Sequence, residues 1–377
     1  MNLAMPPTCP TDQSPRLIIH AGTHKTASTY IQERLRCNQT ELAKLGIHYQ
    51  DPEQCRPKAK KLAAALCKRQ WRKWERLFNE HQGSDILLSA EQFSVPLTDE
   101  TTIHKLEDLA KKHRYELIIV LFIRSQLDYI NSRYIYSLRR FYHHQSFEDF
   151  VENALNGDLE GEKTKRGVIT RRSDVFDFWT YFKPLLRARS RGSRIDFLPF
   201  KKNNQDPFLA FVEHLGLDPS QAWRPCRNQR HLNRSPGIRG VWLARLLSQQ
   251  LANTGITPKQ IANSSQLVLL EEQRQRWNDP AFWGYNCKLA RKVSRHFERN
   301  NQRFAKLAWG TRWEEQFPND VKTLERQRSR YQPQSIEEEE RMHRISQRML
   351  KRIQQQIKHK EIPRRQWMKS LITLKRD

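Results

Sequence analysis

The fold is decided by residues 16–29, which read RLIIHAGTHKTAST. Their first five residues form a short apolar run that predicts a buried strand, and Gly22 follows where the chain has to turn. Apolar residues then recur at helical spacing over residues 28–45, and Gly46 stands where a helix C-cap belongs. We therefore expect a strand, a loop and a helix in immediate succession.

Three other segments are predicted to be strands, at residues 85–89, 117–123 and 194–200. Residues 117–123 read LIIVLFI, an uninterrupted apolar run that is typical of a central strand in a parallel sheet covered on both faces. Helices are predicted between and after these strands, at residues 58–81, 98–113, 125–142 and 207–215. This alternation indicates an α/β fold in which a central parallel sheet is flanked by helices, and such sheets bind ligands beyond the carboxyl ends of their strands.

We predict three regions: a flexible N-terminus at residues 1–15, an α/β domain at residues 16–318 and a basic helical C-terminal extension at residues 319–377. The clearest element of the extension is a helix at residues 335–360, whose apolar side chains form one stripe. The stripe consists of Met342, Ile345, Met349, Ile353 and Ile357. It has to pack either on the core domain or on a second subunit, so a homodimer through this helix stays open as an alternative.

The chain of 377 residues is strongly basic, with 67 Lys and Arg residues against 41 Asp and Glu residues and a formal net charge of +26. The positive electrostatic field of such a protein attracts phosphate, sulfate, carboxylate polymers, nucleic acid or anionic lipid, and the net charge alone does not distinguish among these ligands. The 10 Trp, 17 Phe and 10 Tyr residues are too many for a disordered chain. We therefore expect a compact core that carries polar, helical additions.

The six cysteines are scattered, with no C-x-x-C motif and no Cys/His pairing at metal spacing, so we expect neither a zinc site nor a disulfide framework. The longest apolar run, residues 117–123, is too short to span a membrane, and residues 1–16 lack an apolar signal segment. These features predict a protein of the reducing cytoplasm.

Residues 20–29, HAGTHKTAST, carry the most specific chemical signal. A strand ends there, a glycine turns the chain, and Lys25 arrives with hydroxyl residues where the next helix begins. The unsatisfied N–H groups and the dipole of a helix N-terminus favour an anion, so we predict a phosphate or sulfate at this loop. The alternative is a capped helix start with a solvated lysine.

The spacing of the loop differs from that of a nucleoside triphosphatase. A Walker loop reads G-x-x-x-x-G-K-[ST], with a second glycine directly before its lysine. Here Lys25 lies three residues after Gly22, and His24 occupies the place of the second glycine. This spacing disfavours an ordinary nucleoside triphosphatase.

The string GTHKTAST at residues 22–29 resembles the 5′-phosphosulfate loop of the sulfotransferases that use 3′-phosphoadenosine 5′-phosphosulfate (PAPS), in which K-[TS]-G-T-[TS] is typical. Ala27 stands where that family usually has glycine. The resemblance implies a P-loop-like fold of the sulfotransferase type, with PAPS as donor and Lys25 at the bridging oxygen and the sulfate. It also implies a 5′-phosphate site formed by Gly22, Thr23, Thr26, Ala27, Ser28 and Thr29.

A second sequence motif of this family, its 3′-phosphate site, is also found in the chain. Its 3′-phosphate site is an arginine at the end of a central strand, with a serine eight residues later in the following helix. Here Arg124 follows the strand at residues 117–123, and Ser132 stands at that separation. Arginine can grip a phosphate through two parallel N–H bonds, and the serine adds a donor. Taken alone, these two could be a salt-bridge residue and a plain surface residue.

The candidate catalytic residues are Lys25, Glu91 and His24. In the polysaccharide and tyrosyl branches of the family, a glutamate just after a strand takes the proton of the acceptor hydroxyl, and Glu91 is similarly placed. A surface carboxylate or a helix cap is the alternative for Glu91. Other branches use histidine as the base, so His20 and His24 are rivals. His24 lies inside the loop, where we expect it to shape the loop or to touch the sulfate.

By this resemblance the chain is a sulfotransferase that moves a sulfuryl group from PAPS to an acceptor hydroxyl by direct in-line transfer, with no metal. Its basic clusters, such as Arg139-Arg140, exceed what one nucleotide needs and favour an anionic carbohydrate or glycoconjugate as acceptor. Residues 233–235 are expected either at the acceptor or nucleotide cleft or at a helix start, with Ser235 as the N-cap ahead of Pro236.

Two other functions stay open. One is an ATP-dependent small-molecule or sugar kinase that keeps the nucleotide cleft, although the missing Walker spacing argues against it. The other is a basic nucleic-acid-binding protein whose aromatic side chains stack on single strands. Because the aromatic residues here mostly follow apolar periodicity, we expect them in the core and expect no specific nucleic acid partner.

Overall fold

The computed structural model describes residues 14–50, 59–157, 164–166, 169–171, 176–200, 206–225, 234–318 and 320–373. Its centre is a five-stranded sheet in the order β2-β3-β1-β4-β7, and every neighbouring pair is parallel. The strands are β1 (Arg16–His20), β2 (Ile47–Gln50), β3 (Asp85–Ser89), β4 (Glu116–Ile123) and β7 (Arg194–Pro199). The predicted P-loop-like α/β fold with a central parallel sheet is therefore confirmed.

The burial of β4 explains why its residues 117–123 are apolar without interruption. Successive side chains of a strand point to opposite faces, so a sheet covered on both faces needs apolar residues at every position. Ile118, Val120 and Phe122 belong to one buried cluster. Ile119, Leu121 and Ile123 belong to the other.

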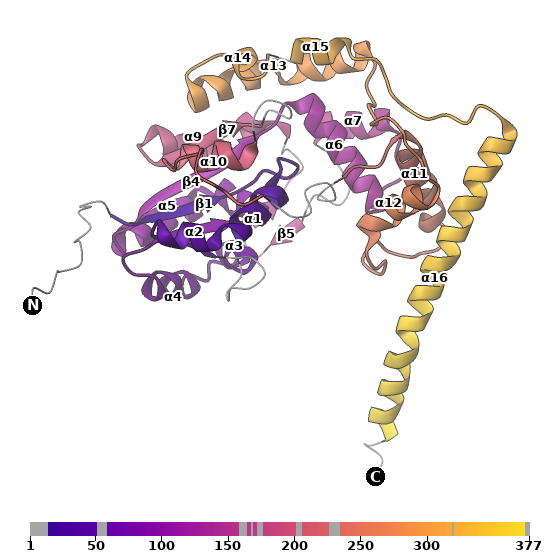
Figure 1. Cartoon of the computed structure of the whole chain (residues 1–377), viewed down its shortest axis with the longest axis horizontal. Coiled ribbons are helices and arrows are strands. Elements are labelled where there is room, and N and C mark those ends of the chain that lie inside the picture. The colour runs from indigo at the N-terminus through magenta and orange to yellow at the C-terminus, as the bar shows by residue number, and fades with distance from the viewer. Residues whose placement is uncertain are drawn as a thin grey trace, which may run out of the picture.

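Helices cover both faces of the sheet (Figure 1). The face of Val120 packs against α1 (Ser28–Cys37), α2 (Gln39–Lys44) and α10 (Pro207–His214). The face of Leu121 packs against α3 (Ala59–Cys67), α4 (Arg72–Glu80), α5 (Glu100–Lys112) and α9 (Lys183–Ser190). The predicted helices at residues 98–113 and 207–215 thus correspond to α5 and α10, and that at residues 125–142 corresponds to α6 (Gln126–Arg139).

Two predicted helices are each divided in the structure. The pattern over residues 28–45 forms α1 and α2, which meet at Asn38. The Asn38 side chain donates to Arg34 O at 2.7 Å and accepts from Arg224 N at 2.7 Å. The break therefore depends on a partner far away in the sequence. The pattern over residues 58–81 likewise forms α3 and α4.

Strand order places a ligand crevice at the carboxyl end of β1. The chain passes from β1 to β3 on one side, and then crosses to β4 on the other side of β1. The order thus reverses between β1 and β4, and α/β sheets bind their ligands at such a reversal. The loop after β1 and Arg124 after β4 both lie at this position.

The other elements are mostly helical. They are 3₁₀ helices η1 (Glu91–Ser94) and η2 (Pro96–Thr98), helices α7 (Phe147–Asn156), α8 (Phe178–Tyr181), α11 (Ile238–Ala252), α12 (Ser264–Arg274), α13 (Cys287–Trp309), α14 (Trp313–Gln316), α15 (Asp320–Glu325) and α16 (Ile336–Thr373), and the hairpin of β5 (Thr164–Arg166) and β6 (Ile169–Arg171). In the described residues beyond 233, strand pairing is limited to isolated bridges. No helix among the described residues is both long and apolar enough to cross a membrane.

The apolar stripe of α16 packs on α11 of the same chain (Figure 1). Met342, Ile345, Met349 and Ile353 are all buried in the main core. The Ser346 hydroxyl also donates to Gln250 Oε1 at 2.7 Å. Of the two alternatives left open by the sequence, packing within the chain is the one observed, and the stripe does not require a second subunit. The flexible N-terminus predicted at residues 1–15 lies almost entirely outside the described residues.

Candidate functional site

A cavity of about 870 Å³ opens at the carboxyl edge of the sheet. Residues that follow four of the five strands line it: Lys25 after β1, Glu91 after β3, Arg124 after β4 and Phe200 after β7. One face of α6 and its C-cap residue form a wall, with Asp128, Ser132, Tyr136 and Arg140 at four-residue intervals. Cavities of about 300 to 1,000 Å³ are typical of small-molecule sites. The cavity is therefore the candidate active site.

Lys25 and Arg124 lie side by side in this cavity. Arg124 Nη1 donates to Lys25 O at 3.1 Å, and Arg124 Nη2 lies 3.5 Å from Asp128 Oδ1. The Arg124 side chain is buried, and its Nε finds no hydrogen-bond partner among the described residues. A buried guanidinium with an unused donor is suited to bind an oxyanion, since unpaired buried donors are costly.

The ammonium group of Lys25 lies among other cations. Its Nζ is 5.0 Å from the centroid of the Tyr136 ring. Burial, and then the charges of Arg139, Arg124 and Arg133, lower the pKa of Lys25 from 10.5 to about 7. A bound anion would raise the pKa of Lys25 again, because its negative charge favours the charged form of the lysine.

The lining of the cavity is strongly cationic. Its Lys and Arg residues are Lys25, Lys60, Arg124, Arg133, Arg139, Arg140, Arg234 and Arg326. Among the described lining residues, Glu91 and Asp128 are the only carboxylates. In the described part of the chain no three His, Cys, Asp or Glu residues come together as a metal site. The cavity thus favours a multiply charged anion held by side chains.

The structure divides the predicted phosphate loop into two groups of residues. Gly22, Thr23 and Thr26 do not line the cavity, and both threonines are fully buried. Thr26 Oγ1 donates to Thr23 O at 2.7 Å, and Thr23 Oγ1 donates to Phe122 O at 3.2 Å. These two hydroxyls therefore fix the shape of the loop. The residues that face the cavity are His24, Lys25, Ala27, Ser28 and Thr29.

Gly22 brings the loop against Glu91. Its φ of +93° lies in the left-handed region, and a Cβ at this position would be 3.1 Å from both Cα and Cβ of Glu91. Both the backbone conformation and the contact with Glu91 exclude a larger residue at this position. The Glu91 carboxylate accepts from Gln92 Nε2 at 3.0 Å and from Gln32 Nε2 at 3.4 Å, so it is held at the cavity wall.

Replacing Ala27 by glycine is expected to stabilise the folded protein. It is the N-cap of α1 with φ 59° and ψ 18°, a left-handed conformation that is costly for a residue with a Cβ. Ala27→Gly should therefore raise the free energy of unfolding by about 1 kcal/mol, measured by urea denaturation. Unchanged or reduced stability would show that the side chain of Ala27 contributes packing of equal value.

The two histidines near the loop differ in position. His20 is fully buried, its Nδ1 lies 2.7 Å from Ser89 Oγ, and its ring packs on Phe122 and Phe211. Burial lowers the pKa of His20 to about 3, so it is a neutral core residue. It does not line the cavity, and the alternative that His20 is the base was wrong. His24 does line the cavity.

The segment before α11 also lies at the cavity. Arg234, Ser235 and Pro236 line it, and the N-cap of α11 is Gly237. The expectation that Ser235 caps this helix was therefore wrong, and Ser235 lines the cavity instead.

The sequence did not indicate two parts of the lining. Asp128 and Tyr136 were missed, although they repeat at helical spacing with the predicted Ser132, which is a signal that could have been used. Trp283 and Arg326 offered none, because they meet only in the folded chain, where the Arg326 guanidinium lies 4.5 Å from the Trp283 ring centroid.

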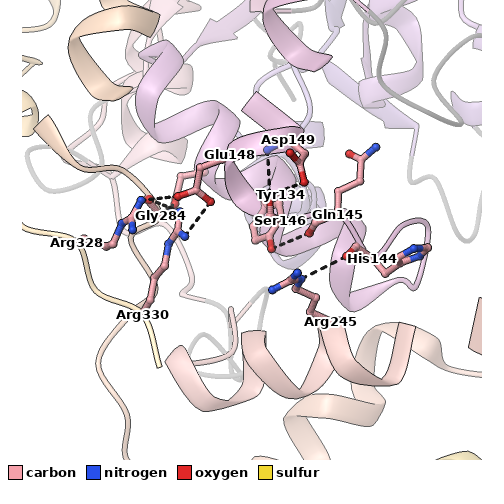
Figure 2. A network of polar contacts seen from close by, with 11 residues as sticks. Tyr134, His144, Gln145, Ser146, Glu148, Asp149, Arg245, Gly284, Arg328 and Arg330 are labelled. Carbon is pink, nitrogen blue, oxygen red and sulfur yellow. Dashed lines mark hydrogen bonds and ion pairs between the residues drawn. The ribbon is translucent and has the colours of Figure 1, made fainter. Parts of the chain in front are cut away.

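The chain after Arg326 is anchored nearby. Trp283 and Ser329 exchange backbone hydrogen bonds of 2.9 Å. Figure 2 shows Arg328 and Arg330 directed toward Glu148 of α7, and Arg330 also donates to Gly284 O. These contacts hold the chain that follows α15 beside the cavity.

The fold and the site define an α/β protein with a cationic cavity at the strand-order reversal of a parallel sheet. No family model matches the chain, and no curated protein matches it. Among solved structures it is similar to a crystal structure of a sulfotransferase from Alicyclobacillus acidocaldarius, with 13% identity and a TM-score of 0.37. That similarity covers 63% of this chain and 94% of the other. A likeness at this level assigns neither a family nor an activity.

Proposed function

We propose that the protein is a sulfotransferase that moves the sulfuryl group of PAPS to a hydroxyl of an anionic carbohydrate or glycoconjugate. One observation carries the proposal: the hydrogen bond of 3.1 Å from Arg124 Nη1 to Lys25 O. It joins the ends of β1 and β4, so that two motifs far apart in the sequence contribute to one cavity. A donor with phosphate groups at two positions needs two such cationic groups in one cleft.

The residues at the cavity fit this donor. Arg124 and Ser132 would hold the 3′-phosphate, and this assignment is supported by the Nε of Arg124, which no described residue accepts from. Lys25, Ser28 and Thr29 would hold the phosphosulfate at the start of α1, where helix N–H groups point outward. When bound, PAPS supplies an activated sulfuryl group attached to a phosphate leaving group.

Glu91 would then act as the general base, and Lys25 would stabilise the leaving group. The Glu91 carboxylate takes the proton of the acceptor hydroxyl while that oxygen forms its bond to sulfur. The electron pair of the broken oxygen–sulfur bond remains on the 5′-phosphate, where the Lys25 ammonium stabilises the added charge. His24, beside Lys25 on the cavity wall, is proposed to shape the loop or to contact the sulfate.

Ligand-dependent thermal stability tests the proposed function. Adenosine 3′,5′-bisphosphate at about 100 times its Kd should add about 2.7 kcal/mol to the free energy of unfolding, whereas ATP with Mg²⁺ should add much less. Stabilisation by ATP with Mg²⁺ alone would favour the kinase. A steep salt dependence of oligonucleotide binding, with no response to the bisphosphate, would favour the nucleic-acid-binding protein.

The affinity for the bisphosphate should depend on pH through Lys25. In the free protein its pKa is about 7, and a bound anion raises that value. The complex then holds a proton that the free protein has lost above pH 7, so affinity falls as pH rises, by at most about tenfold per pH unit. Calorimetry between about pH 7.5 and pH 9 in two buffers measures the affinity and the proton uptake. Lys25→Met should flatten the profile, and a flat profile in the unaltered protein would contradict this role.

A further inference from the structure

Residues along one face of α6 mark successive positions along the length of the cavity. Ser132, Tyr136 and Arg140 line the cavity at four-residue intervals, which correspond to about 6 Å each along a helix axis. Lys25 Nζ lies 5.0 Å from the Tyr136 ring centroid, and Arg124 precedes Ser125, the N-cap of the helix. If the proposed function is correct, the 3′-phosphate lies toward the start of α6 and the sulfuryl group lies near Tyr136. The part of the cavity at the end of α6 is then left for the acceptor.

Beside Arg140, two further arginines line that end of the cavity, Arg139 and Arg234. Arg139 is 7% exposed, its Nη1 donates to Arg234 O at 2.6 Å, and its Nε has no partner among the described residues. This hydrogen bond joins the end of α6 to the segment before α11. The charges of both arginines also act on Glu272, which does not line the cavity and accepts from Gly237 N at 2.7 Å.

Arg139 also lies close to the position of the reaction. Among the charges that act on Lys25, that of Arg139 has the largest effect. The proposed donor contacts use Lys25 and Arg124 and leave Arg139 and Arg234 unassigned. A buried arginine with an unused donor beside an exposed one can receive a carboxylate or sulfate group.

We propose that Arg139 and Arg234 form an acceptor subsite that binds an oxyanion, a carboxylate or a sulfate, located close to the hydroxyl that accepts the sulfuryl group. This inference rests on the proposed function, because that function places the donor at the other end of the cavity. The acceptor is then a sugar that carries its negative charge on the reacting unit or on the unit next to it. Neutral sugars and distantly charged sugars bind weakly.

Calorimetry in the presence of saturating adenosine 3′,5′-bisphosphate tests the subsite with three tetrasaccharides. Hyaluronan offers carboxylates, heparin offers carboxylates and sulfates, and chitotetraose is neutral. We expect binding of one or both acidic probes and none of the neutral probe. Binding of hyaluronan identifies a carboxylate as sufficient, whereas binding of heparin alone identifies a sulfate.

Arg139→Gln and Arg234→Ala should each weaken binding of the acidic probe about 10- to 100-fold. Both should leave the bisphosphate affinity unchanged below pH 7, where Lys25 is charged with or without Arg139. Arg234 is exposed, so we expect Arg234→Ala to fold. This variant therefore tests the subsite even if Arg139→Gln fails to fold. The matched control is Arg303→Ala, which removes an arginine that lies 5.9 Å from the Trp179 ring centroid, outside the cavity lining.

The outcomes separate this inference from the proposed function. Failure of the unaltered protein to bind the bisphosphate would overturn the proposed function. Bisphosphate binding without acidic-probe binding, or unaltered probe affinity in Arg234→Ala, would overturn the subsite alone. A loss of bisphosphate affinity in Arg139→Gln would assign that arginine to the donor and also overturn the subsite.

Discussion

Replacing Arg124 by alanine is expected to weaken adenosine 3′,5′-bisphosphate binding by about 2 to 4 kcal/mol, or roughly 30- to 700-fold. Arg124 is 9% exposed and its Nε donor has no partner in the described part of the chain, so a phosphate would pair with a charge that water barely reaches. Buried charged hydrogen bonds contribute more than exposed ones. Calorimetry of the variant and the unaltered protein measures the difference.

Two further variants make the Arg124 result interpretable. Arg124→Lys keeps the positive charge but loses the planar fork, so its affinity should lie between those of Arg124→Ala and the unaltered protein. Arg303→Ala removes an arginine outside the cavity and should bind normally. Because Arg124 also donates to Lys25 O, circular dichroism should confirm that each variant is folded. Unaltered affinity in Arg124→Ala would remove this residue from the site.

Glu91→Gln should lower sulfuryl transfer about 100- to 10,000-fold, the usual contribution of a general base, and leave bisphosphate affinity unchanged. Glutamine keeps the volume of the side chain beside Gly22 and cannot accept the hydroxyl proton. The assay is single-turnover transfer of radiolabelled sulfate from PAPS to the acidic tetrasaccharide that binds. Glu152→Gln, which loses only an ion pair with Lys292 outside the cavity lining, is the matched control.

The alternative outcome for Glu91 is also informative. If Glu91→Gln retains full activity, the base lies elsewhere on the cavity wall, and His24 becomes the candidate to test. A loss of bisphosphate affinity in Glu91→Gln would instead indicate that the carboxylate supports the shape of the loop, because Gly22 approaches it closely.

Segments with strong local patterns were predicted correctly from the sequence. The strand over residues 117–123 is apolar at every position because both of its faces are buried, and this burial leaves a direct trace in the sequence. The edge strand β2 (Ile47–Gln50, IHYQ) leaves a weaker trace and was missed. The break at Asn38 was missed because its partner, Arg224, is distant in the chain.

The features of the candidate site also fall into two groups, those that the sequence predicted and those that only the structure showed. The sequence by itself determined the parallel α/β fold and the two motifs at strand ends, since an apolar run, a turn glycine and a helix start are local features. Only the tertiary structure decided that Lys25 and Arg124 are neighbours, that His20 is a core residue, and that Arg139 and Arg234 share the cavity. The physical reason is that each of these facts depends on which strands pair and which helices pack together. Those contacts join residues that no short stretch of sequence contains.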